Sequence, residues 1–125
     1  MWRLLESYEL TVKSASRRYR PDGWEKGSKD LPVAGRPKMV AYCFARSILD
    51  VGNIDKSLLD ALQGDVMVTD AQVCWSAAAG IRTTADAGVL VAVARLDSAA
   101  SLTEQTTAGC GLVLAAMDLL AASPA

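Results

Sequence analysis

The clearest pattern of apolar and polar positions lies between residues 71 and 96. Apolar side chains occupy every second position from Ala71 to Ile81, as on a strand with one buried face. The stretch from Gly88 to Leu96 is almost entirely apolar, which is typical of a strand covered on both faces. We therefore predict strands over 66–82 and 86–96 that pair as an antiparallel hairpin.

Helical patterns lie on either side of this pair. Ser101 and Glu104 have the spacing of a capping box, in which each side chain bonds the backbone N–H of the other residue. A long helix is predicted from there, over 102–122. Pro37 suits the first turn of another helix, predicted over 37–50, and Gly64 suits the end of a short one over 55–63.

The amino-terminal third is harder to interpret. Tyr8, Leu10 and Val12 alternate with polar residues, which predicts a strand over 7–15, although a helical face over the same residues remains an alternative. Residues 17–38 then form a long polar loop, and a loop of this length is usually functional or mobile. The chain is expected to be one α+β domain over residues 1–125, a small antiparallel sheet packed by helices.

The carboxyl-terminal helix is apolar around most of its circumference from Ala108 onward. One side of such a helix can cover the sheet, and the other side then needs a second partner. A small sheet also has edge strands that invite pairing. These features predict a homo-oligomer, most simply a two-fold dimer.

The composition excludes several kinds of active site. The chain has no histidine, so a Ser-His-Asp triad and a histidine-ligated zinc site cannot form within it. Cys43, Cys74 and Cys110 are odd in number and lack metal-like spacing, which favours a reducing compartment without disulfides. We expect neither a secretory leader nor a membrane span, and therefore a cytoplasmic protein.

Two remaining patterns do not predict chemistry. Cys110 lies in a glycine-rich stretch that would activate a thiol only if a helix began directly after it, whereas the Ser101 cap places it in mid-helix. Aspartates recur every five residues from Asp50 to Asp70, without the order of a calcium loop, and suit caps and turns. No catalytic residue, metal ligand or cofactor is predicted.

Charge is unevenly spread along the chain. Residues 1–38 carry nine Lys/Arg and five Asp/Glu, whereas residues 39–125 carry four and nine. The basic end is able to bind an anionic partner, to dock on its own acidic body, or to stay solvated. Trp75 is expected to fill the core under a helix, or else to form a wall of a ligand cavity. The candidate binding residues are Arg17, Arg18, Tyr19, Arg20, Trp24 and Trp75.

The leading functional hypothesis is a non-enzymatic binding or assembly protein, with a small-molecule or partner site beside the 17–38 loop. One alternative is a histidine-independent enzyme that uses carboxylate, Tyr or Cys chemistry. The other is an anion or nucleic-acid binder acting through the basic end, because guanidinium groups pair with phosphates and aromatic rings stack on bases.

Overall fold

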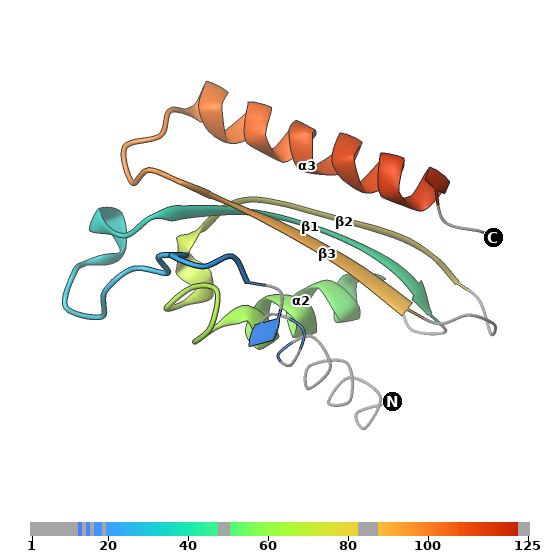
Figure 1. The fold of residues 1–125 in the computed structure, drawn as a ribbon, viewed down its shortest axis with the longest axis horizontal. Coiled ribbons are helices and arrows are strands. Elements are labelled where there is room, and N and C mark those ends of the chain that lie inside the picture. The colour runs from blue at the N-terminus through green and yellow to red at the C-terminus, as the bar shows by residue number, and fades with distance from the viewer. Residues whose placement is uncertain are drawn as a thin grey trace.

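The computed structural model describes residues 13, 15, 17–18, 20–47, 51–82 and 88–122. A three-stranded sheet is covered by one helix on each face (Figure 1). In chain order the elements are η1 (Val33–Gly35), β1 (Lys38–Ser47), α2 (Val51–Leu62), η2 (Asp70–Gln72), β2 (Val73–Arg82), β3 (Gly88–Leu96) and α3 (Leu102–Ala122). The predicted α+β class is confirmed. None of the described helices is both long and apolar enough to cross a membrane.

The strand order is β2-β1-β3, with β1 parallel to β2 and antiparallel to β3. The sheet is therefore mixed, and the hairpin predicted over 71–96 is wrong because β2 and β3 lie on opposite sides of β1. A parallel pair needs a crossover connection, usually a helix, and α2 supplies it here. The apolar runs located β2 and β3, but they carry no information about which strand lies between them.

The central strand is the segment for which a helix was predicted over 37–50. Val40, Tyr42 and Phe44 alternate with Met39, Ala41, Cys43 and Ala45 along β1, and the members of both sets are buried or half-buried. A strand covered on both faces shows no polar alternation, so its period cannot be told from that of a buried helix. Pro37 precedes this strand and does not start a helix.

The main core lies between the sheet and α2. Met39 and Cys43 of β1 pack with Leu58 and Leu62 of α2 and with Met67 from the following turn. The predicted helix over 55–63 is confirmed as the carboxyl-terminal part of α2. Gly64 follows the helix with φ +98°, the left-handed conformation that glycine adopts without strain at a helix end. The predicted strand over 66–82 begins only at Val73, because residues 63–72 form turns and η2.

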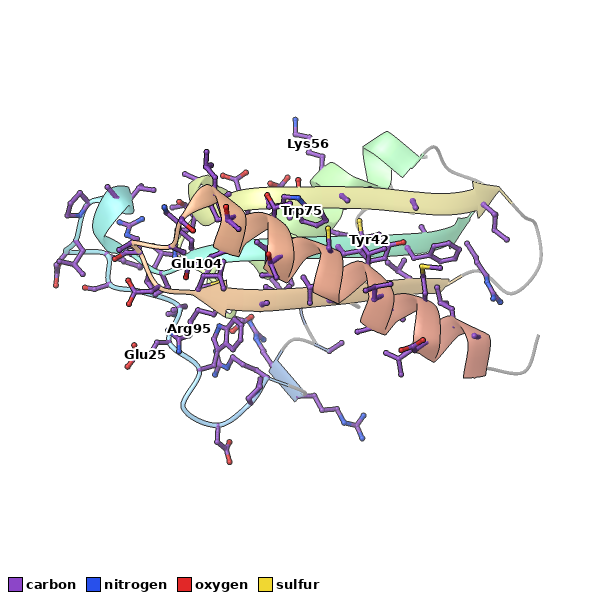
Figure 2. The ribbon with its side chains drawn as sticks, turned by 90° about the horizontal axis from the view of Figure 1, so that it is seen from above. Glu25, Tyr42, Lys56, Trp75, Arg95 and Glu104 are labelled. Carbon is purple, nitrogen blue, oxygen red and sulfur yellow. The ribbon has the colours of Figure 1, made fainter. Side chains whose placement is uncertain are left out.

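The opposite face of the sheet is covered by α3, whose predicted bounds and cap are confirmed. The Glu104 backbone N–H donates to Ser101 Oγ (3.1 Å), and the Ser101 N–H donates to Glu104 Oε1 (3.3 Å). Trp75 is half-buried beneath this helix, directly against Gly109 (Figure 2). A Cβ atom at Gly109 would overlap the indole ring, so glycine sets the distance between helix and sheet here.

The strand predicted over 7–15 is wrong where it can be checked. Lys13 and Ala15 are helical, as are Arg17 and Arg18, and residues 7–12 lie outside the described part of the chain. At residues 13 and 15 the helical alternative is therefore the better interpretation.

The long loop is held to the body of the protein by the side chain of Gln72, which is 3% exposed. Its Nε2 donates to the carbonyls of Lys26 (2.9 Å) and Pro37 (3.0 Å). Its Oε1 accepts from the N–H groups of Val68 (2.8 Å) and Thr69 (3.2 Å). One amide thus joins both ends of the 26–37 loop to the turn that precedes β2.

The loop also carries internal bonds. The buried Arg36 donates from Nε to the Ser28 carbonyl (2.9 Å) and from Nη2 to the Lys29 carbonyl (3.3 Å). The segment therefore has a defined packed path beside the sheet.

We expect Gln72→Leu to lower the free energy of unfolding by about 3 kcal/mol, because each buried polar group left unpaired costs roughly 1–3 kcal/mol. Gln72→Glu should be at least as destabilising at neutral pH, because it keeps the acceptor for Val68 and Thr69 but buries a carboxylate oxygen against the two carbonyls that now accept from Nε2. Urea unfolding measures the stability, and the rate of tryptic cleavage at Lys26 and Lys29 measures loop release. Unchanged stability and cleavage in Gln72→Leu would contradict the role given to this amide.

Two glycines of α3 form a matched pair. Gly109→Ala should destabilise the protein by about 1–3 kcal/mol, because the added methyl overpacks against Trp75. Gly111 has no neighbouring atom within 4 Å of its added Cβ, so Gly111→Ala should stabilise by up to about 1 kcal/mol through helix propensity. Thermal unfolding of both variants measures the difference, and equal shifts in melting temperature would show that α3 does not pack on Trp75.

Candidate functional site

Basic side chains from the amino-terminal third gather at the carboxyl end of α2. Lys13 Nζ donates to the carbonyls of Ala61 (3.2 Å) and Gln63 (3.1 Å). Lys26 Nζ donates to the Gly64 carbonyl (2.6 Å). The last carbonyls of a helix have no intrahelical partner and carry partial negative charge, so these lysines stabilise the end of α2.

Two arginines bind the turn directly beyond this helix end. Arg17 Nε lies 3.0 Å from Asp65 Oδ2 in an ion pair, and Arg20 Nη1 donates to the Asp65 carbonyl (2.6 Å). Docking on the chain's own body, one of the three alternatives for the basic end, is what the structure shows.

This docking leaves much of the positive charge at the surface. Arg20 and Lys26 donate to carbonyls, which have no formal charge, so no carboxylate among the described residues neutralises either cation. The Arg17 side chain is 66% exposed despite its ion pair, and Arg18 and Lys29 are exposed as well. We call this group the cationic segment: Lys13, Arg17, Arg18, Arg20, Lys26 and Lys29.

Carboxylates lie close to the same turn. Gln63 Nε2 donates to Asp60 Oδ1 (3.4 Å), and Gln63 Oε1 accepts from the Asp70 backbone N–H (3.3 Å). Gln63 thereby links an acidic residue of α2 to the first residue of η2. Within the described ranges, no group of three or more Cys, Asp or Glu residues is placed to hold a metal ion. The side chains of Asp50 and Asp55 lie outside the described part.

The structure brings together only part of the predicted binding set. Arg17 and Arg20 lie beside Trp24, whose indole N–H donates to the Val66 carbonyl (2.8 Å). Trp24 is half-buried and packs against the core, so its ring is not a free stacking surface. Trp75 lies on the other face of the sheet, under α3, and Tyr19 lies outside the described residues.

Sequence reasoning missed Lys13, although a signal for it exists. Lys13 and Arg17 are both helical and are spaced i and i+4, which places them on one side of a helix, and Arg20 follows outside the helical residues. The strand assignment concealed this spacing. No sequence signal predicted that Gln63 links Asp60 to Asp70, since both contacts depend on the path of the turn between α2 and η2.

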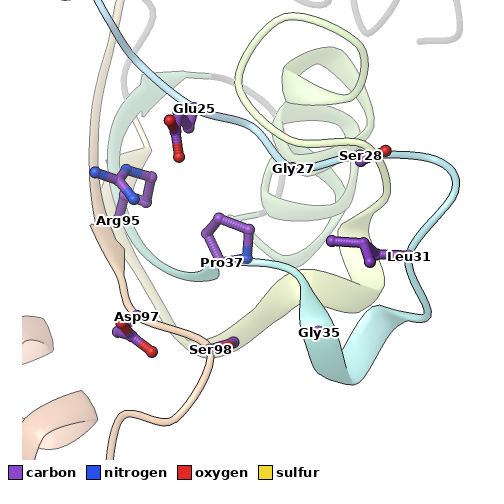
Figure 3. Close-up of a pocket in the computed structure, with 9 residues that line it drawn as sticks. All are labelled: Glu25, Gly27, Ser28, Leu31, Gly35, Pro37, Arg95, Asp97 and Ser98. Carbon is purple, nitrogen blue, oxygen red and sulfur yellow. The ribbon is translucent and has the colours of Figure 1, made fainter.

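A shallow groove of about 470 Å³ lies between the long loop and the end of β3 (Figure 3). Its lining residues are Glu25, Gly27, Ser28, Leu31, Gly35, Pro37, Arg95, Asp97 and Ser98. The groove is open and carries two carboxylates against one guanidinium, which does not suit a phosphate-bearing molecule.

A protein-family model described as "Endodeoxyribonuclease RusA" matches residues 5–94. The matched stretch includes the whole cationic segment, β1, α2, β2 and most of β3, and it ends before α3. Comparisons with curated proteins and with solved structures gave no match.

This match corrects the functional hypothesis. The expected non-enzymatic binding protein with a small-molecule ligand is wrong, because the family is one of DNA-cleaving enzymes. The nucleic-acid alternative, which placed the partner at the basic end, fits the family better. Histidine-free composition did not exclude an enzyme, since carboxylates and bound cations remain available. The family model matches nearly three quarters of the chain, and the chain therefore belongs to the RusA family of endodeoxyribonucleases.

Proposed function

We propose that this protein is an endonuclease that cleaves the phosphodiester backbone of DNA. The family match over residues 5–94 is the observation that carries the proposal. The reaction adds water across one P–O ester bond. A new P–O bond forms from the water oxygen, which loses a proton, and the departing sugar oxygen gains one.

The cationic segment is proposed to hold the DNA backbone. Its cations are prepositioned by the end of α2, so they lose little conformational freedom on binding. Arg20 and Lys26 retain their formal charge while bonded to carbonyls, and cations of this kind neutralise phosphates. DNA then lies along the turn over residues 63–66, beside Asp60 and Asp70.

The chain must activate water without histidine. In nucleases a divalent metal ion commonly supplies a nucleophilic hydroxide, and Mg²⁺ takes carboxylate ligands. The described residues do not form such a ligand group, so we assign no metal site and route no step through one. Asp65 lies in the turn itself and is ion-paired with Arg17, and Asp60 and Asp70 are the described carboxylates on either side of that turn.

Cleavage is tested with labelled linear and branched DNA and with supercoiled plasmid. We expect nicking in Mg²⁺ or Mn²⁺ that stops when EDTA removes the metal. Asp60→Asn and Asp70→Asn should each reduce the rate at least tenfold, while Asp97→Asn should not, because Asp97 follows β3, on the opposite edge of the sheet from β2. Absence of cleavage on every substrate with both metals would overturn the proposal.

The role of the cationic segment is tested with Arg20→Gln/Lys26→Gln. Glutamine keeps an N–H donor on a shorter side chain while two charges are removed, and circular dichroism checks that the variant is folded. Affinity for DNA should fall, and the slope of log K against log salt should flatten by up to about 1.8, or about 0.9 per phosphate contact. Arg46→Gln, a single charge change in β1, is the control. Equal slopes for the double variant and the native protein would place the DNA elsewhere.

A further inference from the structure

The loop that precedes β1 carries an exposed apolar run. Leu31, Pro32, Val33 and Ala34 are consecutive, and all of them are exposed. Leu31 is 48% exposed and Val33 42%. Single exposed apolar side chains are ordinary on a protein surface, but an exposed run of this length is unfavourable unless it has a function. We call these four residues the apolar tip.

The apolar tip has a fixed conformation. The Leu31 N–H donates to the Ser28 carbonyl (3.3 Å), and the Arg36 N–H donates to the Val33 carbonyl (3.1 Å). The Arg36 guanidinium donates to the carbonyls of Ser28 and Lys29, so this buried residue closes the turn. Side chains presented on such a turn lose little conformational freedom when they bind a partner.

The apolar tip lies at the same end of the sheet as the turn over residues 63–66, along which DNA is proposed to lie. Because β1 and β2 are parallel, the loop before β1 and the turn before β2 share that end (Figure 1). Lys26 bonds the turn, and the Cα atom of Leu31 is at most about 18 Å from that of Lys26 along the chain. Five base pairs of B-DNA at about 3.4 Å each span the same length. A short duplex held by Lys26 is therefore long enough to reach the apolar tip.

The charges around the apolar tip determine which part of the DNA it can contact. Lys29 is exposed and belongs to the cationic segment, so it holds a phosphate beside the tip. Asp30 is exposed as well, and Leu31 borders the groove that contains Glu25 and Asp97 (Figure 3). Carboxylates repel phosphates. The partner of the tip is therefore a base and not the sugar–phosphate backbone.

We propose, as an extension of the DNA binding proposed above, that the apolar tip inserts beside a base and separates it from its neighbour in the stack. Leu31 and Val33 are the contacting side chains. Leu and Pro are among the residues that DNA-binding proteins insert between base steps. Unstacking costs free energy, and the cost is least where a base is mispaired. The tip should therefore strengthen binding most at a mispaired step.

The fluorescence of 2-aminopurine tests the insertion, because this base is brighter when it is unstacked. The probe is a duplex of about 30 base pairs with 2-aminopurine beside a single T·T mismatch, held in EDTA to prevent cleavage. We expect the native protein to raise the fluorescence. The double variant Leu31→Ser/Val33→Ser should abolish the rise and weaken binding by about tenfold, because two apolar contacts are lost.

Two further variants serve as controls. Leu31→Met keeps an apolar side chain of similar size, so it should retain both the fluorescence rise and the affinity. Leu102→Ser removes a side chain that is 80% exposed on α3, which covers the other face of the sheet from α2 (Figure 1). This variant should bind the probe as the native protein does. Circular dichroism checks that each variant is folded.

The salt dependence of binding separates a base contact from a displaced cation. The double variant should keep the native slope of log K against log salt, because it loses no phosphate contact. Native affinity and fluorescence in the double variant, or a flatter slope, would overturn the insertion and leave the proposed DNA binding intact. Absence of binding to matched and mismatched duplexes alike would overturn both.

Discussion

The buried amide of Gln72 determines how the amino-terminal third meets the rest of the protein. Its four hydrogen bonds use both of its donors and both lone pairs of its oxygen. A buried amide that is fully paired stabilises the fold, whereas a partly paired one is costly. The path of the 26–37 loop, the turn before β2 and the entry to β1 through Pro37 therefore depend on one another through this side chain.

The fixed loop path connects the fold to the proposed function. Lys26 presents its carbonyl to Gln72 and its ammonium group to the Gly64 carbonyl. The same residue is thus held by its backbone and displays its charge at the end of α2. Since Lys13, Arg20 and Lys26 donate to neutral carbonyls and Arg17 forms an ion pair, the fold concentrates positive charge and neutralises only part of it. A surface of this kind favours a phosphate backbone, in agreement with the family of DNA-cleaving enzymes.

The two faces of the sheet pack against different helices and support different surfaces. The face under α2 holds the larger hydrophobic core and supports the cationic segment. The layer of side chains between the sheet and α3 is thinner, because Gly109 lets the helix lie directly on Trp75. Small residues of α3 face the sheet, and the larger Leu and Met side chains lie on the outward side of the helix. This division explains why an apolar surface and a basic surface lie on opposite sides of one small protein.

The sequence by itself determined the elements whose signals are local. The Ser101–Glu104 cap predicted the start of α3, Gly64 predicted the end of α2, and apolar runs located β2 and β3. Only the tertiary structure showed that β1 is a strand, because a strand buried on both faces has no alternation of apolar and polar residues. Only the tertiary structure showed the strand order, because strand pairing depends on contacts between residues far apart in the sequence. The basic residues were recognisable from the sequence, but their docking was not. Most of their partners are backbone carbonyls at the end of α2 and in the turn after it, which are free to accept only because the helix ends there.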